Sequence, residues 1–179
     1  DILKESLGVI NERANSLSAF IQSYQELAKL PAPNRQKLDI KAELEQVTVL
    51  FPEVNFEFLA KTENQSERES ELNADPAQLR QLLINLLKNA QEASKQANKN
   101  VKVAINWKQD KDHFILTIKD NGPGIKNPEN IFVPFYSTKP GGSGIGLLLC
   151  RQIAEGHGGQ LLLSNAADYG CIASLRIPS

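Results

Sequence analysis

The stretch "DPAQLRQLLINLLKNAQEAS" (residues 75–94) predicts a long helix on which the rest of the fold is built. Asp75 supplies an N-cap side chain, and Pro76 fits the first helical position, where no backbone donor is needed. Leucine and alanine recur at helical spacing as one apolar stripe, formed by Leu79, Leu82, Leu83, Leu86, Leu87, Ala90 and Ala93. We therefore expect an amphipathic helix that packs on a core and runs to about Asn98.

Two asparagines, Asn85 and Asn89, lie four residues apart on one shoulder of this stripe, together with Gln78 and Glu92. Asparagine is a mediocre helix former, and its amide is costly to bury without a partner. Two interpretations stay open from the helix alone. Either the amides bond to nearby backbone, or their carbonyl oxygens face a cation or a phosphate-bound water, since Mg²⁺ prefers oxygen ligands.

The elements on either side of this helix mix helices and strands. Helices are predicted over 39–51 and 144–156, and strands over 54–60, 101–108, 113–120, 159–165 and 171–178. The strands fall mostly in two runs separated by helices. This order favours a two-layer α/β sandwich with a mixed sheet and about three helices over a doubly wound parallel sheet.

Residues 1–30 are predicted to form one long N-terminal helix. Its apolar positions alternate in steps of four and three, through Leu3, Leu7, Ile10, Ala14, Leu17, Ile21, Tyr24 and Ala28. Such a heptad seam favours a second helix as partner over packing on the helix's own domain. Pro31 and Pro33 break the helix, so we place a boundary between a helical segment, 1–35, and a globular domain, 36–179.

Composition excludes several classes of function. The 179 residues carry 20 basic and 21 acidic side chains. The chain therefore lacks the excess of basic residues that would indicate binding to nucleic acid or to a membrane surface. Cys150 and Cys171 lack the spacing of metal ligands, which argues against a zinc site or a disulfide framework. No apolar run approaches the roughly 18 residues of a membrane helix.

Two glycine-rich stretches are candidate ligand-binding segments. "DNGPGI" (120–125) follows a strand, and Gly122 and Gly124 permit a positive φ or close backbone approach, although an ordinary tight turn explains them equally well. "KPGGSGIGL" (139–147) opens a helix, whose free N–H groups favour a phosphate. It matches neither a Walker A loop nor a Rossmann turn, and a flexible loop is the alternative.

The segment between them, "NIFVPFYSTK" (130–139), carries four apolar residues in surroundings rich in glycine and proline: Phe132, Val133, Phe135 and Tyr136. These side chains either fold the loop over a ligand or pin it to the core. Lys139 at its end is placed to contact a phosphate as a point charge.

In chain order, "NLLKNA", "DNGPGI", "FVPF" and "GGSGIGL" resemble the N, G1, F and G2 boxes of sensor histidine kinases. The ATP-binding domain of those kinases shares a superfamily with DNA gyrase, the large heat-shock chaperones and MutL. The resemblance covers residues 38–179 and implies a Bergerat-type ATP-binding fold. "FYSTKPGGSGIGL" is most similar to the nitrogen-regulation sensors, and the heptad helix resembles the second helix of the family's dimerisation hairpin.

The resemblance implies ATP as ligand and Mg²⁺ as cofactor. Asn89 then matches the Mg²⁺ ligand, and Asp120 matches the carboxylate that accepts the adenine 6-amino proton. Asn85, Asn89 and Lys139 are the implied catalytic residues. The implied nucleotide-binding residues are Asn89, Ala93, Asp120, Gly122, Gly124, Ile125, Phe135, Ser137, Thr138, Lys139, Gly142, Ser143, Gly144, Ile145, Gly146 and Leu147.

Asn85 stands where the superfamily members that hydrolyse ATP carry a glutamate base. An amide cannot take a proton from water, so we expect ATP to be held with little hydrolysis and its γ-phosphoryl group to be transferred elsewhere. A steadily hydrolysing, chaperone-like module is the alternative, and a coiled-coil interaction domain without catalysis is another.

Neither His113 nor His157 lies in the sequence context of the family's phosphoacceptor histidine, so both are interpreted as structural or surface residues, and the acceptor is expected upstream of this chain. The resemblance also implies a homodimer through the helical hairpin and a response regulator as partner. It further implies a cytoplasmic location, below a membrane anchor in the full-length bacterial protein.

Overall fold

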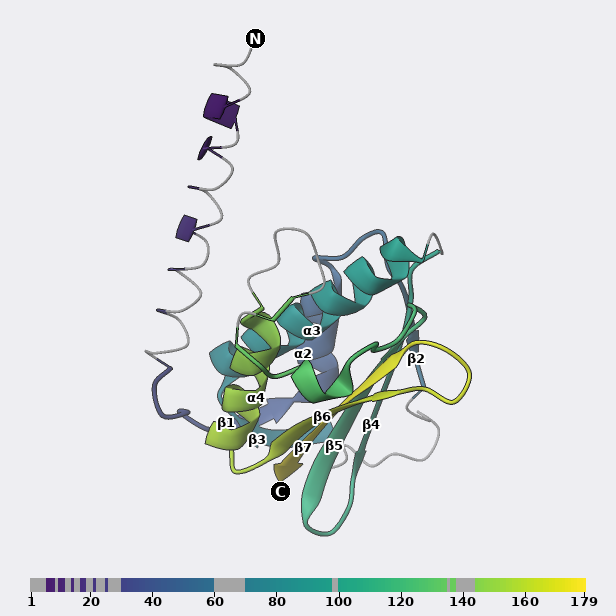
Figure 1. Cartoon of the computed structure of the whole chain (residues 1–179). Helices are drawn as coiled ribbons and strands as arrows, with labels where there is room; N and C mark the ends of the chain where they lie inside the picture. Colours follow the sequence, from purple (N-terminus) through teal and green to yellow (C-terminus); the bar gives the residue numbers. More distant parts are fainter. Residues whose placement is uncertain are drawn as a thin grey trace.

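The computed structural model describes residues 30–59, 70–97, 100–134, 136–137 and 144–179, together with short pieces of the first 25 residues. Three helices pack on one face of a five-stranded sheet (Figure 1). They are α2 (Ile40–Thr48), α3 (Pro76–Gln96) and α4 (Gly146–Gly156). The predicted two-layer α/β arrangement is therefore confirmed.

The sheet is mixed, as predicted. Its strands are β2 (Asn55–Phe58), β4 (Lys102–Gln109), β5 (His113–Asp120), β6 (Gln160–Asn165) and β7 (Cys171–Pro178), in the spatial order β2-β4-β5-β7-β6. β2 pairs with β4 in parallel, and every other neighbouring pair is antiparallel. β5 therefore lies in the centre of the sheet, and its carboxyl end at Asp120 is enclosed by neighbours.

Helix α3 is the central element of the helical layer, because it contacts α2, α4, β4 and β5. It begins as predicted: Asp75 is the N-cap, its side chain accepts from the backbone N–H groups of Ala77 and Gln78, and Pro76 follows. The leucines of the predicted stripe are buried, with Leu82, Leu83 and Leu87 fully so. They pack in one hydrophobic core with residues of the sheet such as Phe114.

A separate two-stranded ribbon, β1 (Gln36–Asp39) with β3 (Glu71–Ala74), is absent from the sequence-based prediction. The strands pair antiparallel, with Leu38 opposite Leu72. Each has four residues, too few for alternation to be recognised against a polar background. Only the pairing of segments distant in sequence turns them into strands.

The residues that the structure describes within the first 25 are helical, in agreement with the predicted N-terminal helix. Four of the heptad positions among them are largely exposed: Leu7, Ile10, Leu17 and Ile21, with exposed fractions from 47% to 63%. The other seam positions, apart from the exposed Ala14, lie outside the described residues. A search of the described helices finds none with the length and hydropathy of a membrane span.

Candidate functional site

Asp120, at the carboxyl end of β5, is the best-anchored side chain of the predicted site. It is 8% exposed, and its Oδ1 accepts the backbone N–H of Gly122 at 2.8 Å and that of Cys171 at 3.1 Å. One contact lies within the turn and the other reaches β7. The carboxylate is thus held over the turn, as predicted, as a buried acceptor in a fixed orientation.

Gly122 places this turn directly against α3. A Cβ atom on Gly122 would lie 2.8 Å from Cβ of Ala93 and 3.0 Å from the carbonyl carbon of the same residue. Side chains do not fit at such distances, so the turn approaches the helix only because position 122 is a glycine. Three predicted site residues, Ala93, Asp120 and Gly122, are therefore brought together by the fold.

The polar shoulder of α3 faces the same region. Asn85, Asn89 and Glu92 are half-buried, as expected for positions at the side of the apolar stripe. Ala93, which was assigned to the buried stripe, is also only half-buried. Gln78 differs, because it is buried and its Nε2 donates to the carbonyl oxygen of Pro31 at 2.9 Å. The expectation that Gln78 is a partly buried shoulder residue is therefore wrong: it anchors the segment that follows the N-terminal helix.

Asn85 packs against α4. Its side chain hydrogen-bonds to the Cys150 thiol, and a Cβ atom on Gly146 would lie 3.9 Å from its Cγ and Oδ1. Cys150 is fully buried, its Sγ donates to the carbonyl oxygen of Leu82 at 3.6 Å, and burial raises the pKa of its thiol to about 12. Cys150 is therefore a neutral thiol that links α4 to the turn of α3 that carries Asn85.

The start of α4 supplies a third part of the site. Gly144 has a φ of +66°, and Ile145, the N-cap residue, is buried and provides no side-chain cap. The first-turn N–H groups of such a helix attract an anion. Gly146 opens the helix opposite Asn85, and Leu147 packs against the core. These residues therefore lie beside the asparagine shoulder.

Several predicted site residues lie outside the described residues: Phe135, Thr138, Lys139, Gly142 and Ser143. Ser137 is described and exposed. In the preceding segment, Phe132 packs against the core and under the guanidinium of Arg151, whose Cζ lies 5.2 Å from the ring centroid. Val133 is 45% exposed, so of the two interpretations left open for this segment, pinning to the core holds for Phe132 and not for Val133.

The two histidines have the structural roles that were predicted. His157 is buried, its Nδ1 donates to the carbonyl oxygen of Ile153 at 2.7 Å, and its Nε2 accepts the backbone N–H of Asp75 at 3.0 Å. His113 lies on the sheet, with its Nδ1 3.0 Å from a guanidinium nitrogen of Arg176.

Asn165, the last residue of β6, is a site neighbour that the sequence did not identify. The oxygen and the nitrogen of its side-chain amide each form a hydrogen bond with the backbone of Ile125, one of the predicted binding residues. Its only sequence signal is an asparagine at the end of an apolar strand, which is common in turns. The contact joins segments 40 residues apart and emerges only from the fold.

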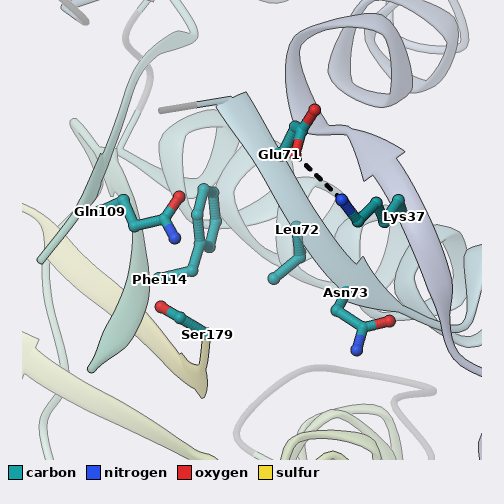
Figure 2. Close-up of a pocket in the computed structure, with 7 residues that line it drawn as sticks. All are labelled: Lys37, Glu71, Leu72, Asn73, Gln109, Phe114 and Ser179. Carbon is teal, nitrogen blue, oxygen red and sulfur yellow. Dashed lines mark ion pairs between the residues drawn. The ribbon is translucent and has the colours of Figure 1, made fainter. Parts of the chain in front are cut away.

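A pocket of about 220 Å³ lies elsewhere, between the β1–β3 ribbon and residues near the turn of the β4–β5 hairpin (Figure 2). It is lined by Lys37, Glu71, Leu72, Asn73, Gln109, Phe114 and Ser179. An ion pair between Lys37 and Glu71 spans its rim, with Nζ and Oε2 3.8 Å apart. No predicted site residue lines this pocket, so the converging residues around Asp120 are the better candidate site.

The donors at that site fit a magnesium nucleotide. Asp120 offers a buried acceptor for a base N–H, Gly122 and Gly124 allow the turn to pack closely against Ala93 and Asn165, and α4 presents backbone donors. The amide oxygen of Asn89 is the kind of hard ligand that Mg²⁺ prefers, alongside phosphate oxygens. These residues therefore have the chemistry that a site for a magnesium nucleotide requires.

Comparison with known proteins also indicates an ATP-binding domain. Residues 74–179 match the family described as "Histidine kinase-, DNA gyrase B-, and HSP90-like ATPase". The histidine-protein kinase AtoS of Escherichia coli is 29% identical over 183 residues, covering 99% of this chain and 29% of the relative. The sensor kinase PilS of Pseudomonas aeruginosa is 27% identical, covering 90% of this chain and 31% of the relative. The chain thus spans less than a third of these relatives.

Solved structures agree in fold. The catalytic domain of the histidine kinase ThkA is 29% identical, with a TM-score of 0.68, covering 81% of this chain and 97% of that domain. A longer ThkA chain, in complex with the response regulator TrrA, is 26% identical, with a TM-score of 0.74, covering 99% of this chain and 52% of that one. The chain therefore belongs to the family of histidine kinase-, DNA gyrase B- and HSP90-like ATPases, and its globular part is an ATP-binding catalytic domain of the histidine kinase type.

Proposed function

We propose that this chain binds Mg·ATP between α3, the turn at 120–125 and the start of α4, and transfers the γ-phosphoryl group to a histidine on a dimerisation helix. The observation that carries the proposal is the buried carboxylate of Asp120, held by two backbone donors next to the asparagine shoulder of α3. Catalysis by such a site rests on positioning and on charge neutralisation.

Asp120 selects the base. Its carboxylate accepts a hydrogen bond from the 6-amino group of adenine, whereas guanine presents a carbonyl oxygen at that position and is repelled. A hydrogen bond to a charged group contributes about 1.5–3 kcal/mol, which corresponds to roughly ten- to hundred-fold in affinity.

The asparagines act on the phosphates. Asn89 holds Mg²⁺ through its side-chain oxygen, and the bound ion neutralises charge on the triphosphate. Asn85, held by Cys150, provides an amide where a hydrolytic enzyme needs a base, so water near the γ-phosphate is not deprotonated. The site therefore retains ATP until an acceptor side chain arrives.

The glycine-rich loop completes the site in this proposal. Backbone N–H groups at Gly142, Gly144 and Gly146 reach the phosphates, while Lys139 and Ser143 make polar contacts from the lid. Phe135, Ser137 and Thr138 belong to the segment that closes over the nucleotide, which excludes water from the transferred group.

The complete protein is proposed to be a two-component sensor. A response regulator then takes the phosphoryl group from the histidine, in line with the complex between ThkA and TrrA. Further proposals are a homodimer through the heptad helix, a domain boundary near residue 35, a cytoplasmic catalytic domain below a membrane anchor, and membership of the nitrogen-regulation subgroup. They rest on sequence resemblance and on the exposed heptad positions.

The test of the function is a calorimetric titration of the 179-residue chain with ATP, with Mg²⁺ and in its absence. We expect binding that Mg²⁺ strengthens, with the gain lost in Asn89→Ala and kept in the control Asn73→Ala on β3. No binding of ATP would overturn the proposal.

A second measurement separates a kinase from a steady ATPase. We expect slow release of phosphate from ATP, no stable labelling of this chain alone, and labelling of an added dimerisation hairpin that carries the acceptor histidine. Sustained hydrolysis without transfer to the hairpin would instead favour the chaperone-like alternative.

A further inference from the structure

Asn165 pairs with the backbone of Ile125 through both ends of its side-chain amide. The N–H of Ile125 donates to Oδ1 at 2.6 Å, and Nδ2 donates to the carbonyl oxygen of Ile125 at 3.0 Å. Two residues that exchange both bonds in this way are the unit of an antiparallel strand pair. The Asn165 side chain thus extends the sheet beyond the end of β6 and takes the place of a strand's backbone.

Few side chains other than asparagine are suited to this contact. The pairing needs one donor and one acceptor a fixed distance apart on a short side chain, which an amide has and a carboxylate or hydroxyl lacks. Gly124 is adapted to the same contact: its φ is +78°, and a Cβ atom there would lie 2.7 Å from Oδ1 of Asn165. The glycine of the turn and the asparagine of β6 are therefore one structural unit.

The β6–β7 hairpin also contacts the other end of the turn, at Asp120. The backbone N–H of Cys171 donates to Oδ1 of Asp120, and a Cβ atom on Gly170 would overlap the carbonyl oxygen of Asp120. The hairpin loop is itself closed by a bond from the N–H of Ala166 to the carbonyl oxygen of Gly170 at 2.9 Å. Residues 165–171 thus hold the turn at 120–125 from both ends.

We propose that Asn165 is a positioning residue for the base-binding turn. It acts through Ile125 and Gly124 and keeps the turn in the binding conformation before the nucleotide arrives. Without it the turn has to be ordered by the nucleotide itself, and that ordering reduces affinity. The inference rests on the proposed nucleotide site, but it concerns a residue outside the four sequence boxes.

The test compares Asn165→Ala, which removes both bonds, and Asn165→Asp, which keeps the acceptor but sets a carboxylate oxygen against the carbonyl of Ile125. The matched control is Asn73→Ala, at an exposed asparagine on the distant pocket rim (Figure 2). Affinity for ADP is measured by calorimetry, amide hydrogen exchange is followed peptide by peptide, and urea denaturation reports global stability.

We expect both variants to bind ADP roughly five- to thirty-fold more weakly than the parent chain, as for the loss of one or two neutral hydrogen bonds. Exchange should accelerate at residues 120–125 in the free variants and return to the parental rate when ADP is saturating. The control should match the parent in all three measurements.

Three results would overturn the inference. One is ADP affinity within twofold of the parent in both variants. The second is faster hydrogen exchange spread evenly over the sheet, and the third is failure of both variants to fold. Each of these two results would mark Asn165 as a general structural residue. If the parent itself binds no ADP, the proposed function fails, and the exchange of the free turn still reports on Asn165.

Discussion

The backbone N–H of Asp75 donates to Nε2 of His157 at 3.0 Å, across 82 positions of sequence. Asp75 is the N-cap of α3, and His157 follows the last turn of α4. Arg35 and Asn34 join the same cluster, through the carbonyl oxygen of Gly156 and the carboxylate of Asp75. One buried imidazole thus fixes the two helices that carry the proposed nucleotide site, at the end where the segment after the N-terminal helix docks.

Replacing His157 by leucine should destabilise the domain. The backbone donor of Asp75 would lose its acceptor in a buried place, which costs about 1–3 kcal/mol. Urea denaturation of His157→Leu measures this, with His113→Leu on the sheet as the control, for which a smaller change is expected. Equal losses in the two variants would contradict the role assigned to His157.

The stabilising effect of the Asp75 carboxylate should depend on pH. Burial acts to raise the pKa of this carboxyl, but the backbone donors of Gln78, Asn34 and Ala77 outweigh it, so the pKa lies below its usual value. A group with a lowered folded-state pKa stabilises above its unfolded pKa, about 3.9, and loses this effect as the pH falls through the folded value.

The matching measurement is the free energy of unfolding of the parent chain and of Asp75→Asn. The amide keeps an acceptor for the cap but lacks the charge, so the parent should be the more stable from about pH 5 to 7. The difference should shrink below about pH 4, as Asp75 becomes neutral. A difference that stays constant down to about pH 2 would contradict the assignment.

Asp120→Asn should weaken the preference for adenine over guanine. The amide keeps an acceptor for the N–H groups of Gly122 and Cys171 but can turn its donor toward the base. We expect ATP to bind at least about ten-fold more weakly, and GTP to gain relative to ATP. Competition titrations of the two nucleotides check this, with Asp112→Asn at the exposed hairpin turn as the control. An unchanged ratio would remove Asp120 from base selection.

Gly122→Ala should push the turn away from α3. The added methyl would lie 2.8 Å from Cβ of Ala93, and overpacking of this kind costs about 1–3 kcal/mol. Gly156→Ala is the matched control, because its Cβ would meet only Cδ of Pro33, at the ordinary distance of 3.9 Å. Gly122→Ala should lower both the thermal denaturation midpoint and the affinity for ATP. Gly156→Ala should change neither quantity.

The local elements were predictable because their signals are local. Asp75 and Pro76 mark the start of α3, the apolar stripe sets its buried face, and alternation marks β4 and β5. The glycines at 122 and 124 identified the turn. Gln78 was wrongly interpreted, because burial at the edge of a stripe depends on what the next segment covers.

The sequence by itself determined the helices, the sheet strands and the order of the four segments that resemble the family's nucleotide boxes, since periodicity, caps and glycines act over a few residues. Only the tertiary structure decided which residues support the site. Three contacts join segments far apart in the chain: the pairing of β1 with β3, the hydrogen bond from Cys171 to Asp120, and the hydrogen bonds between Asn165 and Ile125. Such contacts form only after the sheet has assembled, and no local pattern of residues encodes them.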